Sequence, residues 1–375
     1  MGNYDVAAFI WPSYTGDDPR TRIFWEKGFG EWQTVMAMTD KGGYEGCRWP
    51  RKPLWGYVNE ADPRVMEMQI QTALDYGVNV FIYDWYWYDN RPFLENCLND
   101  GFLKARNNGD MKFYLMWANH NAEYLWDKRN AGEVDEVIWR GAVTPAVFDE
   151  ICDRTIETYF KRDNYYKIDG CPVYMIFEPD NFIRTFSSTD AAKQGVERFR
   201  EKVKAAGFPD LHLQCVYWAR GNYDWLPDGD PCKGLPYADV MLYLGFDSFT
   251  NYNWGGSVWL DGDYAALTEK YKQRLREYAD RGLIFYPNVT IGWDNNVRHK
   301  KFMPGVVRNN TPEAFHTACE MVREFLDGEC ARGRLSAPLV TVNSWNEWTE
   351  TSYLEPDDLY GYGYLEAIAS AFGKE

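Results

Sequence analysis

The chain has 375 residues, and its 56 Asp and Glu outnumber its 40 Lys and Arg, which gives a formal net charge of −16. Because such a chain repels polyanions, we expect neither nucleic acid nor an anionic membrane surface as a partner. Hydrophobic residues make up 45% of the chain, enough for a large core, yet no run approaches the roughly 18 apolar residues of a membrane span.

Short apolar runs alternate with amphipathic stretches along the whole length. Most of these runs are continuously apolar, which is typical of parallel strands that are covered on both faces. They predict eight strands, at residues 5–10, 78–83, 112–117, 172–177, 212–217, 239–245, 284–290 and 339–343.

The stretches between the predicted strands carry helix signals. Three begin with a capping side chain followed by proline, the residue favoured at the first helical position: Asp62-Pro63, Thr144-Pro145 and Thr311-Pro312. Three glycines stand just before a strand, where a helix ends with a left-handed residue: Gly77, Gly207 and Gly282.

The amino-acid composition does not change along the chain in a way that would mark a second domain. The alternation therefore predicts a single (β/α)8 barrel over residues 1–375. A bare barrel needs about 250 residues, so the rest must form long loops at its carboxyl-terminal face. The longest are expected at 11–61, 118–141, 218–235 and 246–260. A doubly wound open sheet is the rival architecture, but it calls for a glycine-rich phosphate loop after the first strand, where the sequence reads Trp-Pro-Ser-Tyr.

The carboxyl ends of barrel strands meet at one mouth, so residues that follow different strands can share a site. Nearly every predicted strand delivers an aromatic, a carboxylate or an amide there, and 17% of all residues are aromatic. Aromatic faces beside hydrogen-bonding groups suit a sugar ring. We therefore expect substrate contacts from Asp84, Trp85, Trp117, Asn119, Glu178, Trp218, Asp247, Trp293, Asp294, Arg298, Trp345, Asn346 and Trp348.

Two of these positions have competing interpretations, and two others are expected to interact with each other. Asp84 could hold a sugar hydroxyl, act as the acid or cap a helix. Glu178 could bind a sugar hydroxyl or form an ion pair with an arginine at the rim. Asp294 and Arg298 are expected to pair with each other.

The segment Ser344-Trp345-Asn346-Glu347-Trp348-Thr349-Glu350 is the sharpest chemical signal. Two carboxylates lie three residues apart beside two tryptophans. Burial and mutual repulsion raise the pKa of at least one of them, which gives the protonated acid and the ionised base that glycoside cleavage requires. We expect Glu347 and Glu350 to be catalytic; the alternative is a solvated acidic loop.

This segment, continued by Leu354-Glu355-Pro356, resembles the Asn-Glu-Trp-x-Glu signature of glycoside hydrolase family 99 and of the related WbsX-like proteins. Residues 28–32, 117–119, 292–298 and 360–366 resemble further blocks of the WbsX-like branch in the same order, so the resemblance covers essentially the whole chain. Thr349 and Thr351 depart from family 99, where His and Gly are expected.

The resemblance implies a (β/α)8 barrel that cleaves α-mannosidic bonds with retention. Glu347 would be the general base on the substrate's own 2-hydroxyl, which attacks the anomeric carbon to give a 1,2-anhydro sugar. Glu350 would protonate the leaving oxygen and later activate water. We therefore expect a retaining glycoside hydrolase that acts on an α-linked manno- or rhamno-configured glycoside or oligosaccharide.

Two other functions remain open. A glycosyltransferase of cell-surface polysaccharide (O-antigen) assembly would call for a nucleotide-sugar site, and no phosphate-binding helix start or metal-holding DxD stands at a strand end. A non-catalytic carbohydrate-binding barrel would not need both signature glutamates.

No metal or organic cofactor is expected, because the chain has only four histidines and contains neither an HExxH pattern nor a CxxC pair. The first predicted strand begins within five residues of Met1, which leaves no room for a leader and suggests a cytoplasmic protein. A trimmed chain would instead be secreted or periplasmic, and nothing in the sequence indicates an oligomeric state.

Overall fold

The computed structural model describes residues 4–16, 18–39, 43–44, 48–49, 51–127, 129 and 136–373. Its centre is a parallel sheet whose strands pair in the order β10-β9-β8-β4-β2-β1-β14-β12. These strands are β1 (Asp5–Ile10), β2 (Val80–Tyr88), β4 (Lys112–Trp117), β8 (Cys171–Ile176), β9 (His212–Val216), β10 (Ser248–Thr250), β12 (Asn288–Thr290) and β14 (Leu339–Asn343).

The two ends of this sheet meet and make it a barrel. Phe249 of β10 forms a parallel bridge with Phe285, just before β12. The Phe249 amide donates to the Ile284 carbonyl (2.9 Å), and the Tyr286 amide donates to the Phe249 carbonyl (2.8 Å). The predicted (β/α)8 barrel is therefore confirmed.

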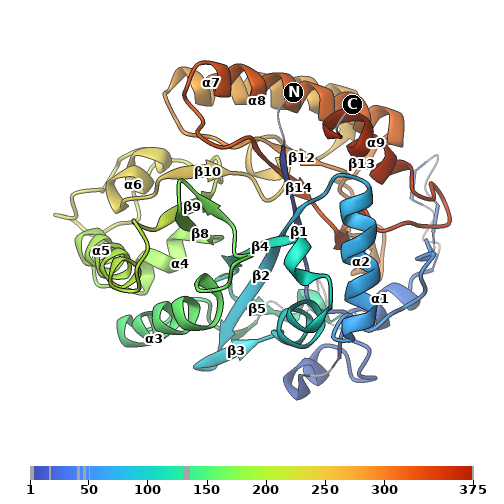
Figure 1. The fold of residues 1–375 in the computed structure, drawn as a ribbon, viewed down its shortest axis with the longest axis horizontal. Coiled ribbons are helices and arrows are strands. Elements are labelled where there is room, and N and C mark those ends of the chain that lie inside the picture. Colours follow the sequence, from blue (N-terminus) through green and yellow to red (C-terminus); the bar gives the residue numbers. More distant parts are fainter. Residues whose placement is uncertain are drawn as a thin grey trace.

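Helices surround the strands on the outside of the barrel (Figure 1). The helix starts predicted from the capping pairs are confirmed; for example, the Asp62 and Thr144 side chains accept hydrogen bonds from backbone amides of the first helical turn. The helices are α1 (Trp32–Met36), α2 (Pro63–Asp75), α3 (Pro145–Thr155), α4 (Pro179–Arg184), α5 (Thr189–Ala205), α6 (Tyr237–Leu244), α7 (Tyr264–Asp280), α8 (Pro312–Ala331) and α9 (Gly363–Phe372).

One predicted strand is wrong. Residues 239–245 belong to helix α6, which closes at Gly245 in the left-handed conformation (φ 94°). Its short sequence is apolar apart from Asp239, which suits a buried helix as well as a buried strand, and periodicity cannot separate the two. The barrel strand is β10, which begins only three residues after Gly245, inside the segment that was expected to be a loop.

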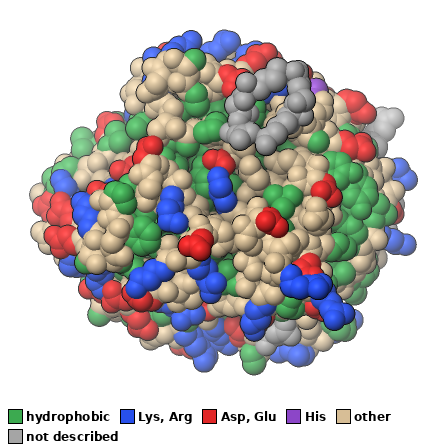
Figure 2. All heavy atoms as spheres, in the orientation of Figure 1, with side chains coloured by type: hydrophobic (Ala, Val, Ile, Leu, Met, Phe, Trp, Pro, Cys, Tyr) green, Lys and Arg blue, Asp and Glu red, His purple; other side chains and the backbone are tan. Residues whose placement is uncertain are grey.

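The loops at the carboxyl ends of the strands contain short paired strands of their own. The short strands outside the barrel sheet are β3 (Arg91–Phe93), β5 (Ala122–Glu123), β6 (Val137–Trp139), β7 (Lys167–Ile168), β11 (Gly262–Asp263), β13 (Val307–Arg308), β15 (Asn346–Glu347) and β16 (Ser352–Tyr353). Acidic and basic side chains intermix over the face drawn in Figure 2. Among the described helices, none combines the length and the apolar character that crossing a bilayer would take.

Candidate active site

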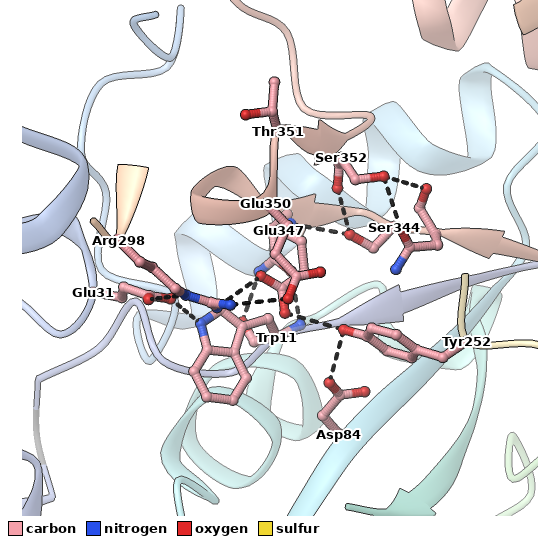
Figure 3. Close-up of polar contacts among 12 residues, drawn as sticks. Trp11, Glu31, Asp84, Tyr252, Arg298, Ser344, Glu347, Glu350, Thr351 and Ser352 are labelled. Atoms are coloured by element: carbon pink, nitrogen blue, oxygen red, sulfur yellow. Dashed lines mark hydrogen bonds and ion pairs between the residues drawn. The ribbon is translucent and has the colours of Figure 1, made fainter. Parts of the chain in front are cut away.

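A cavity of about 190 Å³ lies at the carboxyl end of the barrel. We call it the central cavity. Its charged lining comes from three different places in the chain, and its walls are aromatic. The charged residues are Asp84, Arg298, Glu347 and Glu350, and the aromatic ones include Trp11, Tyr86, Trp126, Phe177 and Tyr252. Figure 3 shows the side chains of Glu347 and Glu350 directed toward the same guanidinium.

That guanidinium belongs to Arg298, whose side chain is 4% exposed. Its Nε lies 3.1 Å from Glu31, its Nη1 lies 2.9 Å from Glu350, and its Nη2 lies 3.4 Å from Glu347. Glu31 also accepts a hydrogen bond from the Trp11 indole. One buried cation therefore joins the two signature glutamates to a third carboxylate from the loop after β1.

The predicted ion pair between Asp294 and Arg298 is wrong. Asp294 instead caps the short helix Asn295–Val297, because its Oδ1 accepts from the Asn296 backbone amide (3.0 Å) and side-chain amide (2.7 Å). Asp294 is buried beside the cavity but does not line it.

One cation cannot compensate for all the buried carboxyl groups around it. Burial raises the pKa of Glu347 well above its usual value, and the nearby charge of Glu350 raises it further. Burial likewise raises the pKa of Glu350, although Arg298 opposes the shift. Burial also raises the pKa of Asp84 well above its usual value. The central cavity can therefore hold a protonated carboxyl next to an ionised one.

Tyr252 links two of these carboxyls. Its hydroxyl lies 3.0 Å from Glu347 Oε1 and 3.3 Å from Asp84 Oδ2 (Figure 3). A phenol carries a single proton, so both contacts are hydrogen bonds only when one of the two carboxyls is protonated. The geometry thus agrees with the raised pKa values of Asp84 and Glu347.

Two buried oxygens of the cavity have no hydrogen-bond partner among the described residues: Asp84 Oδ1 and Glu350 Oε2. Buried polar atoms are normally satisfied, and leaving one unpaired costs about 1–3 kcal/mol. A hydroxyl-bearing ligand could supply the missing donors.

A tight hairpin holds the signature glutamates. Strands β15 and β16 pair, and Ser344 Oγ accepts from the Glu347 amide (3.0 Å) while it donates to the Ser352 carbonyl (2.6 Å). Thr351 turns the chain in the left-handed region (φ 55°), and its hydroxyl donates to the Asp294 carbonyl (2.8 Å). A left-handed position suits glycine, the residue that the family 99 resemblance led us to expect there.

The tryptophans of the signature do not line the cavity, so their predicted place around it is wrong. Trp345 donates to Gln69 Oε1 of α2 (3.1 Å), and Trp348 donates to Glu355 (2.6 Å) and stacks on Tyr353 with 3.8 Å between ring centroids. Both side chains therefore anchor the hairpin on the side that faces away from the central cavity.

Asn346 has a similar anchoring position. The Asn346 side chain forms two hydrogen bonds with the backbone of Trp11. Its Oδ1 accepts from the Trp11 backbone amide (2.8 Å), and its Nδ2 donates to the Trp11 carbonyl (2.9 Å). These contacts fix the hairpin against the end of β1, so Asn346 supports the cavity without lining it.

Trp85 and Trp117 face away from the barrel interior, so the structure does not place them in the cavity. They are neighbours in the register of β2 and β4. Side chains alternate along a strand, and because Asp84 points inward, Trp85 points outward. Trp85 donates to Glu95 (2.8 Å), and Trp117 stacks on Phe148 of α3 with 5.9 Å between ring centroids.

Asn119 and Glu178 lie together at the rim. The Asn119 side chain donates to the Glu178 carbonyl (2.8 Å) and accepts from the Glu178 amide (2.7 Å). The Glu178 carboxylate forms an ion pair with Arg220 at 2.7 Å, which is one of the two interpretations proposed from the sequence. Neither residue lines the central cavity.

Asp247 lies at the opposite end of the barrel from the mouth, which corrects the prediction. It precedes β10, forms an ion pair with Arg200 (2.6 Å) and accepts from the Leu213 amide (2.7 Å). The error follows from the misplaced sixth strand, because a residue after residues 239–245 would have stood at a carboxyl end.

Trp218 and Trp293 do reach the mouth, where they line a hollow beside the central cavity. Sequence reasoning gave no role to Trp11, Glu31, Trp126 or Tyr252. Trp11 directly follows β1, so the strand-end rule could have found it. Glu31 lies in the block 28–32 that carries part of the family resemblance.

Comparison with solved structures shows the type of fold. A solved endo-α-mannosidase of family GH99 from Bacteroides thetaiotaomicron superposes with a TM-score of 0.56 at 14% identity, over 100% of this chain and 97% of that one. A structure described as a glycoside hydrolase-like protein gives a TM-score of 0.60 at 14% identity, over 100% and 95% of the two chains. The fold is thus that of glycoside hydrolase-like barrels.

The family is defined by sequence. The model of the family described as Glycosyltransferase WbsX matches residues 6–368, so the chain belongs to this family. The uncharacterized protein WxcX of Xanthomonas campestris pv. campestris (strain B100) is 25% identical over 379 residues, which cover 98% of this chain and 49% of that protein. The chain spans about half the length of the curated relatives it matches.

Proposed function

We propose that the chain is a retaining glycoside hydrolase that acts on an α-linked manno- or rhamno-configured glycoside or oligosaccharide, without metal or cofactor, and that the barrel with its loops forms one catalytic domain. The observation that carries the proposal is the pair Glu347 and Glu350 in one cavity, joined by Arg298 and both with raised pKa values. Glycoside cleavage needs such a pair, one carboxyl protonated and the other ionised.

In the proposed reaction Glu347 is the general base. It takes the proton of the substrate's 2-hydroxyl, whose oxygen attacks the anomeric carbon while the bond to the leaving oxygen breaks. Tyr252 and Arg298 stabilise the carboxylate before this step, because each lies within 3.4 Å of it. The product of the step is a 1,2-anhydro sugar.

Glu350 is the general acid. Its Oε1 is held by Arg298, whereas its buried Oε2 has no partner among the described residues and is free to carry the proton. That proton passes to the leaving oxygen, and the resulting carboxylate then takes a proton from water as the water opens the anhydro ring. Glu347 returns its proton to the 2-oxygen in the same step, so both carboxyls regain their starting states. In this proposal Asp84 Oδ1, which has no partner among the described residues, accepts a hydrogen bond from a sugar hydroxyl.

The two roles predict different kinetics for Glu350→Gln and Glu347→Gln. Without the acid, aryl glycosides whose phenol leaves easily should still be cleaved, whereas alkyl glycosides should not. Without the base, both kinds of substrate should lose at least about 100-fold in kcat/KM. Hydrolysis of aryl and alkyl α-mannosides and α-rhamnosides, with proton NMR of the first anomer formed, measures both roles and the stereochemistry.

Asp247→Asn is the matched control, since it removes a carboxylate charge at the far end of the barrel. Full activity in both glutamate variants would refute the assignment, and an inverted first product would refute retention.

The family description favours a second candidate, a glycosyltransferase of cell-surface polysaccharide assembly. Thermal stabilisation by a nucleoside diphosphate, and sugar transfer from a nucleotide sugar, would support it. A non-catalytic carbohydrate-binding barrel would instead bind oligosaccharide tightly and release no reducing ends over days.

A further inference from the structure

Two hollows flank the central cavity, and their linings differ in chemistry. The first, of about 460 Å³, is mainly apolar, and we call it the tryptophan hollow; it includes Trp218, Val258, Trp259, Leu260, Trp293 and Met303. The second, of about 350 Å³, is charged, and we call it the arginine hollow; it includes Glu123, Glu178, Asp180, Arg184 and Arg220.

Both hollows share walls with the central cavity, but with different residues. Phe177, Tyr252 and Glu350 line the central cavity and the tryptophan hollow together. His120 and Trp126 line the central cavity and the arginine hollow together. Glu350 thus lies at the boundary between the central cavity and the tryptophan hollow. Glu347 lines the central cavity but neither of the two hollows.

We propose that the tryptophan hollow is the leaving-group subsite and that it takes a leaving group with an apolar face, either a 6-deoxyhexose ring or an alkyl or aryl aglycone. The inference rests on the proposed function, because it takes Glu350 as the acid. A general acid must lie within hydrogen-bond reach of the oxygen it protonates, so the departing group extends to the side that the acid faces.

The lining supports an apolar occupant. Among its described residues Glu350 is the only Asp, Glu, Lys or Arg, so a sugar rich in hydroxyls would find few charged partners there. Trp259 stands in this wall with 81% of its surface exposed. A large exposed aromatic at the edge of a ligand hollow is typical of a stacking platform for an apolar face.

The experiment compares α-mannosides that differ only in the leaving group. One arm uses alkyl groups from methyl to octyl, below the micelle concentration. The other uses disaccharides with mannose or its 6-deoxy analogue at the reducing end. In the unmodified protein kcat/KM should rise along the alkyl series or toward the 6-deoxy sugar, and the arm that shows the rise identifies the occupant.

Trp259→Ala should remove this preference through KM, by roughly tenfold. Leu242→Ala is the matched control, because Leu242 is 50% exposed on α6 and outside the hollow. A preference that persists in Trp259→Ala, or no preference in either arm, overturns the inference while the proposed function stands.

If no glycoside is cleaved, the proposed function fails by itself. Binding of octyl α-mannoside, measured by calorimetry, then still tests the hollow. Affinity that falls in Trp259→Ala but not in Leu242→Ala supports an apolar ligand site, and equal affinity in all three proteins, or no binding, refutes it.

Discussion

Replacing Arg298 with Met should destabilise the fold in a way that depends strongly on pH. Among the described residues, Arg298 is the one cation in contact with Glu31, Glu347 and Glu350, all of which are buried. Removing one partner of a buried ion pair costs about 3–5 kcal/mol, because the remaining charge is left without compensation. We expect the free energy of unfolding to fall by that amount at pH 8.

The pH dependence follows from the carboxyls that remain. Without the guanidinium, which opposes the shift, the pKa values of Glu347 and Glu350 in the folded protein rise further above the unfolded values. A group with a raised folded pKa stabilises the fold below its unfolded pKa, and this stabilisation is lost as the pH rises through the folded pKa. Each unit of pKa shift corresponds to about 1.4 kcal/mol, so protonation at pH 5 should reduce the deficit to about 1–2 kcal/mol.

Urea unfolding of both proteins at pH 5, 6.5 and 8, followed by tryptophan fluorescence, measures the difference. Arg274→Met is the control, because its ion pair with Glu277 (2.6 Å) is half exposed and should contribute below about 1 kcal/mol at any of these pH values. A deficit of Arg298→Met that is the same at pH 5 and pH 8 would refute the reasoning.

Two further predictions test the corrected sixth strand. Asp247→Asn should leave kcat/KM unchanged and lower the melting temperature, because Asp247 pairs with Arg200 far from the mouth; loss of activity would contradict this placement. Gly245→Ala should destabilise the fold by about 1 kcal/mol, because the residue closes α6 at φ 94°, and an unchanged urea midpoint would show that α6 ends differently.

The sequence predicts the barrel well, because the strands and helix caps are local signals. The caps at Asp62 and Thr144 depend only on neighbouring residues, and both appear as expected. The prediction of the sixth strand is wrong because β10 has only three residues, too few to show a hydrophobic pattern. The mainly apolar helix α6 before it gives the stronger signal.

The candidate site is predicted less completely. The two glutamates could be found because they lie within one short segment. Their partner Glu31 lies 267 positions from Arg298 in the chain, and no local pattern links the two. The outward direction of Trp85 also depends on which residues of β2 face the barrel interior. Side chains alternate along the strand, so this direction follows only once Asp84 is known to point inward.

The position of β1 between β2 and β14 has a consequence for biosynthesis. The backbone amide and carbonyl of Trp11, directly after β1, form hydrogen bonds with the side chain of Asn346, 335 residues later. A ribosome adds about 5–20 residues per second, so this edge of β1 stays without its neighbour for about 20–70 s. Nascent chains that have not yet reached β14 lack both the strand that joins β1 to β12 and the two signature glutamates. We expect chaperones to hold such chains until synthesis ends.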